Sequence, residues 1–287
     1  MTKSKTPYIL LLPSTILFLL FVVWPIISVG RLSLQNTNFI NSSFAGIANY
    51  IKLFTDPAFR QAILNTFIFA AFLIPFQIVV PLTIALMAYN TTTKEQTMLR
   101  TMFYIPSLAS AIVISSVWKW IFEYRKGLAN WILGLVGIDR IQWFGQQLPA
   151  IFVITLTINL MSLGGILILY MAVMMGISRE MIDTAICDGA SWSQIRRYIM
   201  IPIISPTILF LGLLAMIGSF QIWENIYVFT SGGPAGKTAS MVYYIYETGF
   251  IKSQYGYASA GSIVLMVIIL GLAMIKKRLE PAEEKYE

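Results

Sequence analysis

The chain has 287 residues, of which 57% are hydrophobic and only 11% are charged. Soluble domains carry roughly a quarter charged residues, so this composition argues against a water-soluble fold and indicates an integral membrane protein. The net charge is +7, but basic residues spread thinly between apolar runs are typical of membrane-protein loops, not of a nucleic-acid-binding surface. Histidine is absent and Cys187 is the only cysteine, which excludes an internal disulfide and a cysteine-rich metal site. We expect no catalytic residue, no metal ligand and no nucleic-acid partner.

Uncharged windows give the number of membrane spans. A helix needs roughly 20 apolar residues to cross about 30 Å of hydrocarbon. Six windows are long enough, and they predict spans near 8–30, 65–89, 103–122, 150–174, 203–223 and 258–275. We therefore expect an all-α integral membrane protein with six transmembrane helices in a single domain over residues 1–287.

The first window also has features of a cleaved signal peptide, because Lys3 and Lys5 precede its apolar run. The run of about 22 residues is longer than the roughly 7–15 of a signal peptide, and no A-x-A-like site follows Val29. We expect a retained helix.

An even number of spans places both termini on one side of the membrane. If that side is the cytoplasm, basic residues are about twice as dense in the inner segments as in the outer ones. The basic cluster Lys276-Lys277-Arg278 directly after the last span adds a cytoplasmic anchor. This favours cytoplasmic termini.

The segment 177–202, between the fourth and fifth spans, has the pattern of two short helices joined by a glycine turn. Ser178 is placed to cap the first helix, and Gly189 has the conformational freedom to end it. Ser191 is placed to cap a second helix that runs as far as Pro202. From the residues alone, a hairpin that rests on lipid headgroups is the simplest interpretation.

Residues Ser231–Thr238 nearly match the phosphate-binding pattern G-x-x-x-x-G-K-[ST], but Ser231 replaces the first glycine. The predicted topology also places this segment outside, away from ATP. An ordinary Gly-Pro turn explains the residues better.

Carboxylates within the membrane are costly and are typical of ion-driven carriers. Here only Glu224 and Glu123 lie near predicted spans, both toward the outer ends. The energy source is therefore expected in another chain.

The segment 177–202 resembles the EAA loop of ABC-importer permeases, whose pattern ends in D-G-A followed by P-x-x-x-P. Asp188-Gly189-Ala190 and then Pro202 and Pro206 match in order and spacing. The E-A-A triplet is represented by Asp183-Thr184-Ala185, in which the first acid is shorter and the second residue is polar. The resemblance implies that a coupling helix docks on an ATPase through Asp183, Thr184, Ala185, Asp188, Gly189 and Ala190.

Two further stretches narrow the resemblance to the sugar permeases. Leu99–Pro106, Val117–Phe122 and Gly127–Asn130 resemble the third-span region of oligosaccharide-type permeases. Phe220-Gln221, Tyr227–Pro234 and Tyr255–Ala258 resemble the segment between their fifth and sixth spans. The similarity is greatest to the maltose/oligosaccharide-type permease that pairs with a second, non-identical one.

The resemblance implies an ABC importer type I permease fold and a subunit with no catalysis of its own. Its partners would be a second homologous permease, two cytoplasmic ATPase subunits that bind ATP and Mg, and an extracytoplasmic sugar-binding protein. The location would be a bacterial-type cytoplasmic membrane. The cargo would be a carbohydrate, with an oligosaccharide as the first choice, and transport would proceed by alternating access.

The passage between two such permeases would lie near the bilayer midplane, where sugars need hydrogen-bonding groups and aromatic faces. Candidate contacts are Asn159, Ser162, Tyr170, Ser219, Gln221, Trp223, Glu224 and Asn225. Interhelical hydrogen bonds or interface anchoring are the competing explanation for each of them. Gly164, Gly165 and Gly212 are better explained by close helix packing.

Two alternatives to a sugar permease remain open. An ABC permease for a non-sugar solute such as glycerol phosphate is the runner-up, because outer cations such as Arg125 and Lys126 would suit an anionic cargo. An ion-coupled carrier or a membrane enzyme is less favoured, for lack of intramembrane carboxylates and of histidine.

Overall fold

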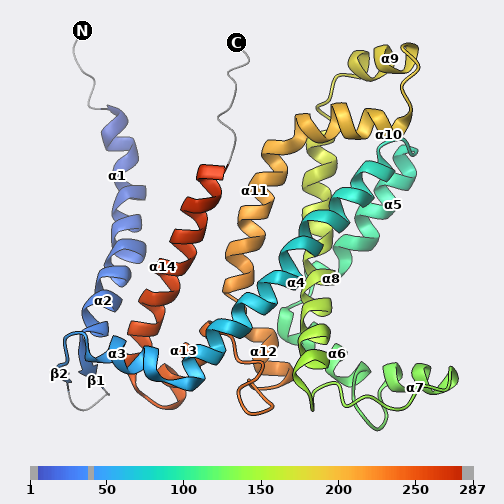
Figure 1. Ribbon diagram of the computed structural model, residues 1–287. Coiled ribbons are helices and arrows are strands. Elements are labelled where there is room, and N and C mark those ends of the chain that lie inside the picture. The colour runs from blue at the N-terminus through green and yellow to red at the C-terminus, as the bar shows by residue number, and fades with distance from the viewer. Residues whose placement is uncertain (1–5, 38–41, 280–287) are drawn as a thin grey trace. The chain divides into compact units, whose positions relative to one another are not determined.

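The computed structural model describes residues 6–37 and 42–279, so Lys3 and Lys5 of the first window lie outside the described residues. The chain divides into two compact units, residues 1–60 with 244–271 and residues 61–243 with 272–287. The elements of Figure 1 are α1 Thr6–Phe18, α2 Trp24–Ser33, β1 Gln35–Thr37, β2 Ser42–Phe44, α3 Ala48–Thr55, α4 Pro57–Ala88, α5 Thr93–Tyr104, α6 Ala111–Ile121, α7 Leu128–Leu135, α8 Gln147–Met174, α9 Arg179–Cys187, α10 Trp192–Ile195, α11 Ile201–Phe220, α12 Glu224–Phe229, α13 Met241–Tyr246 and α14 Tyr255–Leu279.

Five helical segments among the described residues are long and apolar enough to cross a membrane: Leu10–Ser33, Pro57–Ala88, Gln147–Met174, Trp192–Phe220 and Tyr255–Lys276. They match five of the six predicted spans, with ends that shift mostly by a few residues. The fifth span begins well before residue 203, because a π-helical segment, Arg196–Met200, joins α10 to α11 without a break. Pro202 therefore does not end the helix; it lies in the first turn of α11, where proline is tolerated.

The third predicted span, 103–122, is not one straight helix. It consists of two helical segments, Thr93–Leu108 and Ala111–Ile121, which meet at an angle of 95°. The described residues contain six spans only if this bent pair is counted as one span. Pro106 lies in the 3₁₀ turn Ile105–Leu108, and Ala109 and Ser110 are extended, so the α-helical hydrogen bonds stop there. A search for uncharged windows finds the apolar length but not the break.

Helix α8 is the centre of the larger unit. Figure 1 shows it running from the end that carries α6, α7 and α12 to the end that carries α9 and α10. One buried cluster includes Ile151, Ile154 and Phe229, and a second includes Leu167, Tyr170 and Ile204. The length of α8 is thus what separates the two ends of this unit.

Gly164 lets α5 approach α8 closely. A Cβ added at Gly164 would lie 2.2 Å from the backbone oxygen of Phe103, a distance that no side chain could accept. At Gly212 an added Cβ would lie 3.2 Å from Ile78. Close packing explains Gly164 and Gly212, as expected, but not Gly165, where an added Cβ would meet nothing within 4 Å.

In the smaller unit, β1 and β2 form an antiparallel pair in which Gln35 lies opposite Phe44. The Asn49 side chain donates to the carbonyl oxygens of Ser33 and Gln35, at 3.0 and 2.9 Å. This amide therefore fixes the end of the first span to α3.

A carboxylate connects α3, α13 and α14 within the same unit. Asp56 accepts a 2.5 Å hydrogen bond from the Tyr244 hydroxyl and a 3.3 Å bond from Tyr257. Burial alone would raise the pKa of Asp56, but the Tyr244 hydroxyl and the backbone N–H of Ala58 hold it below its ordinary value. Burial and the bond to Asp56 raise the pKa of Tyr244, so the phenol stays the donor.

We expect Tyr244→Phe to destabilise the protein by about 1–3 kcal/mol, because it removes a hydrogen bond to a charged acceptor. Since the pKa of folded Asp56 is lowered, its contribution is present above about pH 4 and is lost as the pH falls through the folded value. Thermal unfolding in detergent measures this; the difference between the variant and the parent should shrink in acid. Tyr198→Phe, at an exposed tyrosine, is the control and should change little.

Candidate functional site

The segment 177–202 forms two helices that project from one end of the larger unit, as Figure 1 shows for α9 and α10. Helix α9 ends at Gly189, whose φ is +81°, a conformation that favours glycine. The N–H of Gly189 donates to Ile186 O and that of Ala190 to Ala185 O, both at 2.9 Å. This is the Schellman arrangement, and it confirms that Gly189 ends the helix.

The start of the second helix is also as predicted. Ser191 Oγ accepts from Gln194 N, and Gln194 Oε1 accepts from Ser191 N at 2.8 Å, which forms a capping box. At the start of α9, however, the Ser178 side chain makes no cap bond. The expectation of a Ser178 cap was therefore wrong, because position alone does not direct the hydroxyl toward the helix.

The two faces of α9 differ. Ile182 is buried against the chain's own core, and Ala185 is partly buried. The expected docking residues Asp183, Thr184, Asp188 and Gly189 are exposed, Ala190 is partly exposed, and the Thr184 hydroxyl donates to Glu180 O at 2.7 Å. Cys187 is exposed as well.

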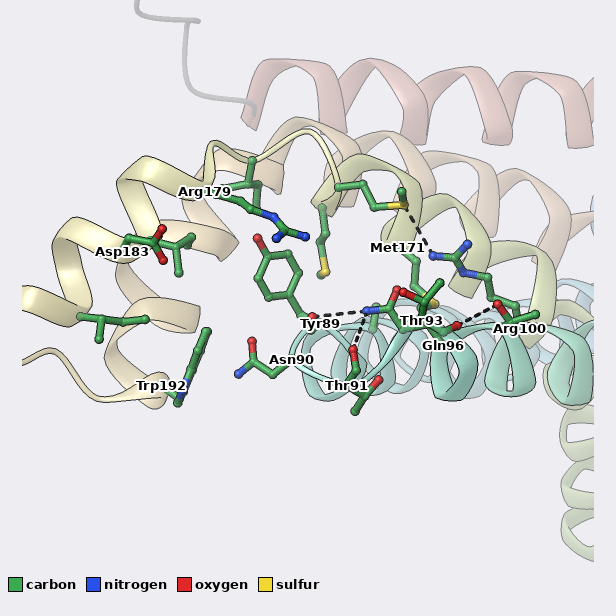
Figure 2. A pocket seen from close by; sticks show the side chains of 17 residues that line it. Tyr89, Asn90, Thr91, Thr93, Gln96, Arg100, Met171, Arg179, Asp183 and Trp192 are labelled. Carbon is green, nitrogen blue, oxygen red and sulfur yellow. Dashed lines mark hydrogen bonds between the residues drawn. The ribbon is translucent and has the colours of Figure 1, made fainter.

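A cavity of about 520 Å³ lies behind α9. Figure 2 shows that Arg179 and Asp183 of α9 line it, together with Tyr89 at the end of α4 and Arg100 of α5. Arg100 Nη2 lies 3.6 Å from Met175 Sδ, and the buried Arg100 Nε has no hydrogen-bond partner among the described residues. Two guanidinium groups and one carboxylate make this a polar space, so α9 is not packed tightly along its whole inner side.

The residues predicted for the passage do not form one cluster. Asn159 and Tyr170 are both buried in α8, but eleven residues separate them, or about 16 Å along a helix. Neither Asn159 Oδ1 nor the Tyr170 hydroxyl has a hydrogen-bond partner within the described part of the chain. Ser162 and Ser219 donate to the carbonyl oxygens of their own helices.

The break between α11 and α12 brings the other candidates together. Gln221 is exposed at the end of α11, and Trp223 and Glu224 are half-buried at the start of α12. The Trp223 and Tyr227 rings are 6.1 Å apart. Asn225 is instead buried, and its amide donates to Ser115 Oγ of α6 at 2.8 Å.

The segment Ser231–Thr238 is a turn closed by its own bonds. Lys237 N donates to Pro234 O at 3.0 Å, and the buried Thr238 hydroxyl donates to Gly233 O at 2.5 Å. The hydroxyl that a phosphate loop would offer to a metal ion is thus engaged inside the turn. This agrees with the interpretation as a Gly-Pro turn.

Sequence reasoning missed two buried asparagines that fix loops in the larger unit. The amide of Asn65 donates to Gly236 O and Ala239 O, at 3.1 and 2.9 Å. The side chain of Asn130 bonds to the backbone of Tyr124 and Ile141. Their position within apolar stretches was a usable signal, since a buried amide needs a hydrogen-bond partner. The sequence does not show which partner each amide finds.

No protein-family model matches the chain. The lactose transport system permease protein of Rhizobium radiobacter is 30% identical over 270 residues, which cover 92% of this chain and 90% of that protein. The arabinooligosaccharides transport system permease protein of Bacillus subtilis (strain 168) is 29% identical over 280 residues, 97% of this chain and 89% of that one.

A solved structure of a bacterial alginate ABC transporter, in complex with an alginate pentasaccharide-bound periplasmic protein, contains a similar chain. The TM-score is 0.84 with 25% identity, over 96% of this chain and 93% of that chain. The apolar helices and these similarities define a multi-pass membrane transport subunit, not an enzyme. The chain belongs to the permease family of ABC transporters. Relatives named for sugar transport are the more similar ones cited above, and others, at 26–27% identity, are named as sn-glycerol-3-phosphate permeases. The expected all-α permease fold is confirmed.

We expect Ser115→Ala to destabilise the protein by about 1–3 kcal/mol, because it leaves the buried Asn225 amide without its partner. The double variant Ser115→Ala/Asn225→Leu should recover part of the loss, since it removes both polar groups. Thermal unfolding in detergent measures both. Ser28→Ala, whose hydroxyl bonds only its own helix, is the control; equal losses in Ser115→Ala and the control would contradict the anchoring role of Asn225.

Proposed function

We propose that this chain is one permease subunit of a binding-protein-dependent importer that moves a carbohydrate, with an oligosaccharide as the first choice, across the bacterial cytoplasmic membrane. It would work with a second homologous permease, two cytoplasmic ATPase subunits and an extracytoplasmic sugar-binding protein. The observation that carries the proposal is the exposed helix α9, ended by Gly189, in a chain similar to sugar permeases over nearly its whole length. ATP and Mg bind to the ATPase partners and not to this chain.

Helix α9 is suited to transmit force. The Schellman turn at Gly189 fixes its C-terminal end, and the capping box at Ser191 fixes the start of α10, so local bonds hold the joint between the two helices. The buried Ile182 attaches α9 to the core, and the opposite face of α9 is open for docking. Closure of the ATPase subunits on ATP would then move α9 as a body and shift the spans between inward-facing and outward-facing states. With α9 on the cytoplasmic side of the membrane, both termini would also lie in the cytoplasm.

For the sugar passage we favour the break between α11 and α12. Gln221 supplies an exposed amide, Trp223 an aromatic face and Glu224 a carboxylate, the groups that a hydroxyl-rich ligand with apolar C–H faces needs. Ser162, Ser219 and Asn225 are engaged within the chain, and Asn159 and Tyr170 are buried, so these five are weaker candidates. A permease for glycerol phosphate or another non-sugar solute is not favoured, because the relatives named for lactose and arabinooligosaccharide transport are 30% and 29% identical, against 26–27% for those named for sn-glycerol-3-phosphate.

The docking proposal predicts a crosslink. Cys187 is exposed on α9, so a single cysteine placed in the cleft of the ATPase should form an oxidant-dependent disulfide with it in the assembled importer. Gly189→Asp should weaken the crosslink and uncouple ATP hydrolysis from uptake, because it adds a charged side chain at the joint. Gel shift of the oxidised complex and ATPase and uptake assays measure these effects.

The control for this crosslink is Cys187→Ser, which should abolish it while uptake continues. If no position from 181 to 190 crosslinks in the complex, or if Gly189→Asp transports normally, α9 is not the coupling element.

The passage proposal predicts that Gln221→Ala and Trp223→Ala lower sugar uptake at least tenfold, about 1.4 kcal/mol, while assembly and basal ATP hydrolysis survive. Uptake into vesicles that contain the complete importer measures this. Ser162→Ala, whose hydroxyl bonds its own helix, is the matched control. Unchanged uptake kinetics in both test variants would place the passage elsewhere.

A further inference from the structure

A second cavity, of about 390 Å³, lies at the end of the larger unit opposite α9, between the end of α6 and helix α7 (Figure 1). Its lining includes Arg125, Lys126 and Arg140, together with Trp120, Leu128 and Trp131. None of the residues that line it is acidic. It belongs neither to α9 nor to the break between α11 and α12, so the function proposed above does not use it.

None of the three cations around this cavity forms a salt bridge within the described residues. Within residues 6–37 and 42–279, the one ion pair found joins Lys252 and Glu247. The nearby Glu123 carboxylate accepts the backbone N–H of Lys126 at 2.5 Å, which closes the turn before α7. Its charge also interacts with those of Arg125 and Lys126, so one negative charge stands beside the three positive ones. The cavity is therefore electropositive and open to an anion.

Asn130 builds the cavity. It is 4% exposed, and its amide nitrogen donates to Tyr124 O and Ile141 O, at 3.1 and 3.0 Å. Its oxygen accepts from Ile141 N and from Trp143 Nε1, at 3.0 and 3.1 Å. Because every polar position of Asn130 is used, the segments that carry Arg125 and Arg140 are held on the two sides of α7.

The apolar part of the cavity identifies the kind of ligand. Trp120 and Trp131 are 63% and 62% exposed, and Leu135 is 67% exposed. A free anion would satisfy the cations but leave these side chains uncovered. An amphiphile with an anionic head and a hydrocarbon tail would cover both, and tryptophan beside basic residues is the pattern of a membrane–water interface.

We propose that this cavity binds an anionic phospholipid from the leaflet opposite α9. The headgroup phosphate lies among Arg125, Lys126 and Arg140, and an acyl chain lies against Leu128, Trp131 and Leu135. The inference needs only that the chain lies in a bilayer, so it stands apart from the identity of the transported solute.

The test uses the full chain, purified in detergent with the subunits that co-purify, delipidated and titrated with phosphatidylglycerol. Native mass spectrometry counts the bound lipids and gives their affinity. Arg125→Gln/Arg140→Gln should weaken one phosphatidylglycerol site about thirtyfold, which corresponds to two cations at about 1 kcal/mol each. Arg60→Gln/Lys237→Gln removes the same charge from exposed residues that do not line the cavity, and it should change the affinity less than twofold.

The apolar half has its own variant. Trp131→Ala should weaken phosphatidylglycerol binding several-fold while leaving the charges in place, and phosphatidylcholine should bind weakly to every variant. Excess inorganic phosphate or an acidic oligosaccharide should fail to displace the lipid. Displacement by either would show a site for a free anion and overturn the proposal.

Two other results would also overturn it. One is equal affinity in the parent and in Arg125→Gln/Arg140→Gln, with both proteins showing the same thermal unfolding. The other is the absence of saturable phosphatidylglycerol binding in the parent, which would mean that α7 is covered by a co-purifying subunit and not by lipid.

Discussion

Hydrocarbon offers no hydrogen-bond partner to a peptide group, and the rest of this structure depends on that constraint. It requires that the backbone groups of each span be paired within a helix. The turns between the spans lack these helical bonds and are held by side chains instead. In three places a buried asparagine does this: Asn49 holds the end of the first span, Asn65 holds the turn near Ala239, and Asn130 holds the loop around α7. In each case one side-chain amide donates to two backbone carbonyl groups, so a single side chain connects two points of the backbone.

The hairpin of α9 and α10 is fixed differently. Backbone bonds at Gly189 and a capping box at Ser191 hold its shape, and Ile182 of α9 and Ile195 of α10 are buried against the core. A hairpin stabilised from within can move as a rigid body, whereas one held by many amide bonds to the core could not. The polar cavity behind α9 leaves room for such motion. Fixed loops at one end of α8 and a locally held hairpin at the other are what the proposed docking of an ATPase on α9 would require.

Composition and uncharged windows were sufficient to predict the fold class and five spans, because length and apolarity determine whether a helix can cross a bilayer. They were insufficient for the third, since the break between Leu108 and Ala111 leaves the apolar run intact while it interrupts the helical backbone bonds. The glycine turn and the capping box were predictable because both depend on local backbone geometry. The hydrogen bond from Asn225 to Ser115 was not predictable, because it depends on which helix lies opposite. The sequence also did not show that the buried oxygens of Asn159 and Tyr170 find no partner within the described residues. The single domain over 1–287 and the docking and passage residues stay predictions.

The broken third span also changes what can be inferred about the outer end of the larger unit. A straight helix over 103–122 would have carried Trp120 along the direction of the helix that begins at Thr93. With the 95° bend, α6 instead turns toward α7, and Ser115 of α6 meets Asn225 of α12. The same bend therefore positions Ser115 beside the break between α11 and α12, and Trp120 at the wall of the basic cavity. A break of two residues between Leu108 and Ala111, which an apolar count treats as ordinary, thus affects the geometry around both candidate binding regions at that end.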